Sequence, residues 1–131
     1  MQIYVKIAAF FGFSGVAAGA FGAHALKQSL QNRDMTHVWE TAVLYTLIHA
    51  IALLASGLAS AKNDSTPNSW LSRACACWTL GVILFAGSLY GLALEGPRFL
   101  GPVTPLGGLF LLAGWVCVFL AANRPSAAKS L

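Results

Sequence analysis

The chain has 131 residues, of which 9% are charged and 57% are hydrophobic, and its mean hydropathy is +0.69. A soluble domain carries roughly 25% charged residues, so this chain has too few polar side chains to cover a water-soluble globule. The composition therefore excludes a soluble enzyme, a disordered protein and a secreted disulfide scaffold. It indicates an integral membrane protein.

The formal net charge is +4, but the eight basic residues stand singly along the chain. A nucleic-acid-binding surface needs a cluster or stripe of basic residues, so no nucleic-acid partner is expected. Isolated basic residues beside apolar segments are typical of a protein whose surroundings are the lipid bilayer.

Four apolar segments are long enough to cross a bilayer, which takes about 20 residues of helix. They run over residues 3–26, 38–60, 72–94 and 104–122. Short connections make consecutive helices antiparallel neighbours. The sequence predicts an all-α fold: a single transmembrane domain over residues 1–131, built as an up-down-up-down four-helix bundle.

The last segment contains its own start signal. Thr104 is a residue type that caps helices, and Pro105 follows it, where a missing N–H costs nothing in the first turn. We therefore expect the fourth helix to begin at Thr104.

The distribution of Lys and Arg predicts the orientation. Five basic residues fall on the side of the two termini and three on the opposite, outer side: Lys6, Lys62, Arg73, Arg124 and Lys129 against Lys27, Arg33 and Arg98. The positive-inside rule then places both termini in the cytoplasm.

The first segment has two interpretations. Lys6 followed by an apolar run that ends at Ala23-His24-Ala25 imitates a cleaved signal peptide. The same run, however, carries glycines on one helix face at spacings of three and four, which allow close helix packing: Gly12, Gly15, Gly19 and Gly22. We expect the segment to be retained, and packing roles also for Gly81, Gly107 and Gly114.

His49 lies near the middle of the second segment, where an ionisable group is a functional candidate. The alternative, which we favour, is a neutral imidazole bonded to a neighbouring group, since no acidic residue shares its depth. His24 lies near the outer end of the first segment, and helical rise separates the two depths by roughly 13 Å. One haem or one metal cannot bind both histidines, so no cofactor, metal site or catalytic residue is expected.

Chemically distinctive side chains gather in the outer half of the bundle: His24, Glu40, Tyr45, Tyr90 and Thr104. A carboxylate so close to hydrocarbon needs a partner or water. One hypothesis is that Glu40 pairs with His24, which lies at matching depth, and anchors a small polar pocket. The alternative is that Glu40 reaches the headgroups while His24 bonds a backbone carbonyl.

Several motifs in order resemble the YgdD-like family of small four-span bacterial inner-membrane proteins. They are Gly19-Ala20-Phe21-Gly22-Ala23-His24-Ala25-Leu26, Trp39-Glu40-Thr41-Ala42 with Tyr45 and His49-Ala50, Gly87-Ser88-Leu89-Tyr90, and Thr104-Pro105-Leu106-Gly107-Gly108 with Gly114-Trp115. The resemblance implies a bacterial inner-membrane location and an uncleaved first helix. It implies no reaction, ligand or catalytic residue, because the family carries a domain of unknown function.

Two functions remain open at this point. The first is a non-enzymatic accessory or assembly component whose partner is another membrane protein. The second is a small-solute or ion transporter that works as a homo-oligomer, because four short glycine-rich helices leave little room for a pore within one protomer.

Overall fold

The computed structural model describes residues 1–61 and 69–123. Lys62, Arg124 and Lys129, which entered the count of basic residues, lie outside this part of the chain. The helices are α1 Gln2–Ala23, α2 Lys27–Asn32, α3 Thr36–Ala61, α4 Ser69–Ala93 and α5 Leu100–Ala122. All except α2 are long and apolar enough to cross a membrane, which confirms the predicted all-α four-helix membrane bundle.

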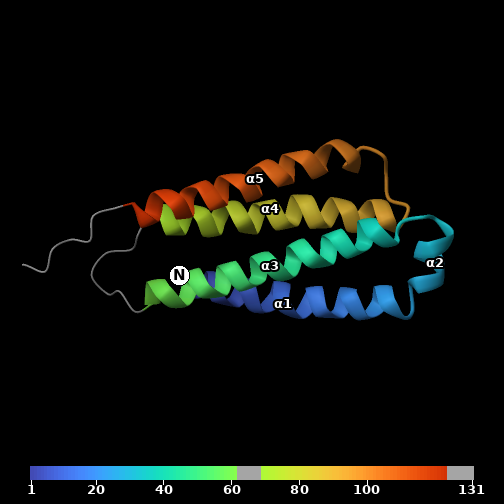
Figure 1. Ribbon diagram of the computed structural model, residues 1–131, viewed down its shortest axis with the longest axis horizontal. Coiled ribbons are helices and arrows are strands. Elements are labelled where there is room, and N and C mark those ends of the chain that lie inside the picture. The colour runs from blue at the N-terminus through green and yellow to red at the C-terminus, as the bar shows by residue number, and fades with distance from the viewer. Residues whose placement is uncertain (62–68, 124–131) are drawn as a thin grey trace, which may run out of the picture.

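The four long helices lie in a row (Figure 1). α1 packs on α3, α3 packs on α4, and α4 packs on α5, so α1 and α5 form the two edges. Within the apolar stretch of each span, 39% of the residues of α3 and 33% of those of α4 are buried, against 17% in α1 and in α5. The two outer helices therefore present most of their apolar surface to the surroundings of the protein.

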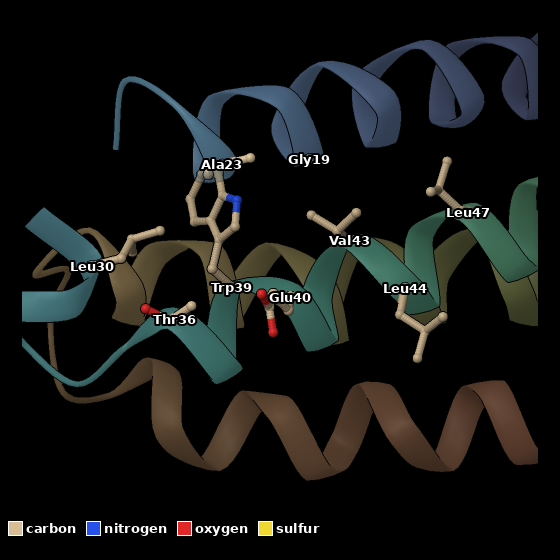
Figure 2. A pocket seen from close by; sticks show the side chains of 10 residues that line it. Gly19, Ala23, Leu30, Thr36, Trp39, Glu40, Val43, Leu44 and Leu47 are labelled. Atoms are coloured by element: carbon tan, nitrogen blue, oxygen red, sulfur yellow. The ribbon is translucent and has the colours of Figure 1, made fainter. Parts of the chain in front are cut away.

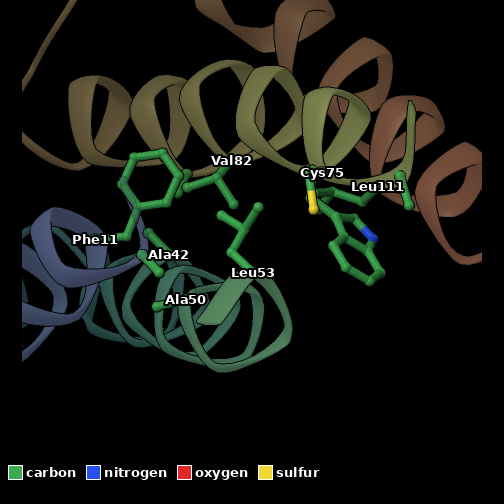
Figure 3. Close-up of a cluster of buried hydrophobic side chains, with 11 residues drawn as sticks. Phe11, Ala42, Ala50, Leu53, Cys75, Val82 and Leu111 are labelled. Carbon is green, nitrogen blue, oxygen red and sulfur yellow. The ribbon is translucent and has the colours of Figure 1, made fainter. Parts of the chain in front are cut away.

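The core lies where α1, α3 and α4 meet. Figure 3 shows Phe11 of α1, Leu53 of α3 and Val82 of α4 pointing toward one another. Small buried residues surround them, among them Ala8, Ala42, Ala50, Ala74 and Ala86. In lipid no hydrophobic drive brings helices together, so small side chains stabilise the bundle by allowing close van der Waals contact.

The start of α5 differs from the prediction. The helix begins at Leu100, and Thr104 is not its N-cap; Phe99 occupies that position without a side-chain bond. Pro102 is tolerated because the first turn of a helix has no intrahelical use for its N–H groups. Pro105 lies inside the helix, where it deprives the Gly101 carbonyl of its usual donor.

The connection between α1 and α3 contains the short helix α2, which the sequence did not predict. Leu30 of α2 is 1% exposed and packs with Trp39 and Ala93. Just after α2, the Arg33 guanidinium donates to the carbonyl of Ala93 and to the Ser29 hydroxyl. A cation at a helix C-terminus is favourable, so Arg33 fastens this connection to the end of α4. We call this end of the bundle the α2 end.

Candidate functional site

His49 is held in the middle of the bundle by two hydrogen bonds. Its Nδ1 donates to the carbonyl of Tyr45 at 2.8 Å, and its Nε2 accepts the indole N–H of Trp115 at 3.3 Å. Since an indole nitrogen can only donate, Nε2 must be the unprotonated nitrogen of a neutral ring. Both ring nitrogens of this buried side chain are thus engaged within the chain.

Aromatic rings surround His49. The rings of Trp78 and Trp115 lie 4.9 Å apart, and each lies 6.1 Å from the imidazole. Tyr45 stacks on the imidazole at 6.1 Å and contacts Phe85 at 4.6 Å. A hollow of about 440 Å³ opens beside these rings, lined by residues of α3, α4 and α5 that include Pro105 and Trp115.

Two members of the predicted outer cluster join neighbouring helices. The Tyr90 hydroxyl lies 3.5 Å from that of Thr46, and its ring meets the ring of Trp39 at 4.8 Å. The Thr104 hydroxyl lies 2.6 Å from that of Ser88, which links α5 to α4. Tyr45 belongs instead to the rings around His49. The structure therefore distributes these residues over separate contacts.

His24 and Glu40 are not brought together. Both belong to the described part of the chain, and no hydrogen bond or ion pair joins them there. His24 borders a shallow hollow with Ala17 and Phe21 of α1, whereas Glu40 borders a different hollow on α3. The pocket expected from this pair is therefore not formed by direct contact.

Trp39 occupies the space between α3 and α1 that the hypothesis had given to Glu40. Its indole N–H donates to the carbonyl of Ala18 at 2.8 Å, and its ring lies directly against Gly22. Sequence reasoning missed this residue as a site element. The available signal was a tryptophan on one helix at the depth of a glycine on its neighbour.

The hollow that Glu40 borders has a volume of about 290 Å³. Figure 2 shows Trp39, Val43 and Leu47 reaching from α3 toward α1, with Thr36 and Glu40 along the same stretch of α3. The remaining lining residues are small or aliphatic: Gly19, Gly22, Ala23, Leu30 and Leu44. We call this space the α1–α3 hollow.

The glycines of α1 differ in what they face. A Cβ at Gly15 would lie 2.7 Å from Cδ2 of Leu47, and one at Gly22 would overlap the Trp39 ring. At Gly19 the nearest atom, of Val43, would be at an ordinary 3.4 Å. Gly12, which belonged to the predicted stripe, has open space beside it.

The glycines between α4 and α5 permit a closer approach. A Cβ at Gly107 would overlap the main chain of Phe85, and one at Gly81 would lie 2.5 Å from Leu111. Gly114 lies against the ring of Trp78, whose Nε1 is buried without a partner among the described residues. All three predicted packing glycines of this hairpin therefore lie at its interface.

Comparison with known proteins identifies the family. The family model described as "Protein of unknown function (DUF423)" matches residues 18–108. A "UPF0382 membrane protein" of Staphylococcus epidermidis is 37% identical over 126 residues, which cover 95% of this chain and 98% of that protein. The chain belongs to this family.

Two further relatives match to a similar extent. The "UPF0382 inner membrane protein YgdD" of Escherichia coli is 40% identical over 117 residues, covering 89% of this chain and 86% of the relative. A "UPF0382 membrane protein" of Haemophilus influenzae is 35% identical over 113 residues. No solved structure matches the chain. The family assignment confirms the resemblance found in the sequence and indicates no biochemical function.

Proposed function

We propose that the protein is a non-enzymatic accessory component of the bacterial inner membrane, which assists the assembly or action of another membrane protein. The single observation that carries the proposal is the state of His49. Both of its ring nitrogens are bonded within the chain, so neither is free to bind a metal or to relay a proton. Proton relays inside membranes are chains of Asp, Glu and His, whereas the two hydrogen-bond partners of His49 are a backbone carbonyl and an indole.

Three hydroxyls inside the spans are likewise bonded within the chain. The hydroxyls of Thr46, Thr79 and Ser14 each donate to a carbonyl of their own helix. What the protein offers its surroundings is mainly the apolar surface of its outer helices. This division supports a role in association within the membrane.

The proposal includes an orientation with both termini in the cytoplasm. Its support is the asymmetry of basic residues, five against three, together with the printed description of the Escherichia coli relative as an inner membrane protein. Reporter fusions at the C-terminus and after Ala61 should be active only with a cytoplasmic reporter. Activity of a periplasmic reporter at either position would overturn the orientation.

The accessory function is tested by crosslinking in intact membranes followed by purification of the whole chain. One defined membrane protein should be captured in stoichiometric amounts, and its level should fall when the chain is deleted. His49→Gln should lower thermal stability without abolishing this capture. If the His49→Gln variant is fully stable but does not restore the level of the captured protein in cells that lack the wild-type chain, His49 is a functional group and the proposal is contradicted.

A transporter that works as a homo-oligomer is the second candidate. The observation that favours it is the hollow of about 440 Å³ beside Tyr45 and His49, which opens at the surface where a second copy would enclose it. Native mass in mild detergent separates the two candidates. A stable symmetric oligomer favours transport, and a monomer favours the accessory function.

A further inference from the structure

We propose that the α1–α3 hollow is a binding site for a membrane lipid whose headgroup ends in a primary ammonium. One acyl chain lies in the hollow, and the ammonium group is bound by the Glu40 carboxylate and the Thr36 hydroxyl. This site is independent of the accessory function proposed above, which does not require it.

The residues at the polar end of the hollow determine which lipid headgroup can bind. Among the acidic residues in the described part of the chain, Asp34, Glu40 and Glu95, only Glu40 lies within one of the spans. Thr36 and Glu40 are one helical turn apart on the same face of α3. Across residues 1–61 and 69–123, neither the Glu40 carboxylate nor the Thr36 hydroxyl has a hydrogen-bond partner. The nearby Arg33 guanidinium is bound to Ala93 and Ser29.

A carboxylate at the edge of hydrocarbon is stabilised by a cation that also donates hydrogen bonds. A primary ammonium carries three N–H donors, which suits one carboxylate and one hydroxyl together. An anionic headgroup would meet the like charge of Glu40 instead. Charge complementarity at this end therefore selects an ammonium lipid over an anionic one.

The rest of the hollow suits a single hydrocarbon chain. Val43, Leu44 and Leu47 continue from Glu40 toward the middle of the span (Figure 2). Seven residues of helix span roughly 10 Å between the levels of Glu40 and Leu47. The glycines on α1 leave space opposite these side chains, and Leu30 of α2 closes the end.

The size of the hollow decides between a lipid chain and a protein partner. Its volume of about 290 Å³ is at the lower limit of small-molecule sites, which begin at ~300 Å³. A transmembrane helix with its side chains is ~10 Å across and is too wide to enter it. One acyl chain entering sideways from the bilayer is the occupant that fits.

The test is lipid retention measured by native mass spectrometry. The whole chain, purified in mild detergent, is equilibrated with equal amounts of phosphatidylethanolamine and phosphatidylglycerol that carry identical acyl chains. Wild-type protein should retain phosphatidylethanolamine in preference. Glu40→Gln should weaken its retention roughly tenfold, as expected for loss of a charge-assisted hydrogen bond.

Glu95→Gln is the matched control, because Glu95 lies at the same α2 end, is exposed, and does not line the hollow. It should leave retention unchanged. Leu44→Trp fills the hollow at a side chain that is already 53% exposed, so the fold is kept while retention of either lipid falls. Circular dichroism and thermal unfolding establish that each variant is folded.

Three results would overturn the proposal: equal retention of the two lipids by wild type, unchanged retention in Glu40→Gln, or an equal loss in Glu95→Gln. If Glu40→Gln or Leu44→Trp instead removes a crosslinked protein and leaves lipid retention intact, the occupant is that protein. The lipid site then fails while the accessory function stands. If the wild-type chain captures no partner protein but retains phosphatidylethanolamine in preference, the accessory function fails while the lipid site stands.

Discussion

The hairpin formed by α4 and α5 and the pair formed by α1 and α3 are both built on glycine, but the glycines meet different things. Gly107 lies against the main chain of Phe85, with only 2.7 Å from a Cβ built there to the Phe85 Cα. Gly15, at a similar distance from the α2 end, lies against the terminal carbons of the Leu47 side chain. Main chains touch between α4 and α5, whereas side chains lie between α1 and α3.

This difference explains where space remains for a ligand. Trp39, Val43 and Leu47 keep α3 away from α1, and the α1–α3 hollow lies between and beside them. The larger hollow near His49 is bounded by α3 as well as by α4 and α5, so it lies where the two hairpins meet. Side chains between α1 and α3 hold the helices apart and leave space for a ligand. The direct contact of main chains between α4 and α5 leaves no such space.

The largest expected effect comes from one methyl group at the main-chain contact. Gly107→Ala should destabilise the protein by ~3 kcal/mol or more, because no rotamer change relieves an overlap with backbone. Thermal unfolding in detergent measures it. Gly108→Ala is the control, since its Cβ would lie 3.8 Å from Phe85 and should be harmless. Equal stability of Gly107→Ala and Gly108→Ala would show that Gly107 does not lie against the main chain of Phe85.

A large residue is needed for a similar effect between α1 and α3. Gly15→Leu should cost about 1–3 kcal/mol, while Gly15→Ala should cost less because the Leu47 side chain can move. Gly12→Leu, one turn earlier on α1 with nothing within 4 Å, should unfold like wild type. A loss in Gly12→Leu as large as in Gly15→Leu would mean that another face of α1 is packed.

A smaller effect is expected from the hydroxyl pair that links α4 to α5. A double-mutant cycle of Ser88→Ala and Thr104→Val should give a coupling free energy of about 0.6 kcal/mol and below ~1.7 kcal/mol, the range of interhelical hydrogen bonds in membranes. Thr79→Val, whose hydroxyl bonds only its own helix, should show no coupling to Thr104→Val. Zero coupling between Ser88→Ala and Thr104→Val would mean that this hydroxyl contact does not stabilise the packing of α4 on α5. The difference from the α1–α3 pair would then rest on glycine packing.

The smallest effect is expected at Gly87, which is exposed on α4 and has no atom within 4 Å of a Cβ built there. Gly87→Ala should be neutral, or should stabilise the helix by up to about 1 kcal/mol through its propensity. The unfolding temperature checks this. A marked loss would show that this face of α4 packs against a second molecule, which favours the homo-oligomeric transporter.

The fold followed from the sequence because the length and apolarity of a span are local properties. The short helix α2 did not, since its residues from Lys27 to Ser29 are polar and the burial of Leu30 depends in part on Trp39 of α3 and Ala93 of α4. The start of α5 was misplaced because Pro105 resembles a first-turn proline, whereas Leu100–Pro102 already form helix.

The candidate site was harder to predict because depth in the membrane does not determine rotation about a helix axis. Counting residues placed His24 and Glu40 at the same level, but His24 borders a separate hollow with Phe21, and Trp39 makes the contact with α1. The partners of His49 on α5 likewise depend on how two helices pack. Only the neutral, bonded state of His49 was favoured from sequence, through the lack of a carboxylate at its depth.

Amide hydrogen exchange of the wild-type protein in lipid nanodiscs compares the two interfaces most directly. Gly15 and Gly107 lie nearly the same number of helical residues from the α2 end, so their depths are matched. Local opening requires less disruption where side chains, not main chains, are in contact. The amides of Phe85 and Gly107 should therefore exchange more slowly than those of Gly15 and Leu47. Exchange that is equally slow or slower at Gly15 and Leu47 would contradict the distinction between the two hairpins.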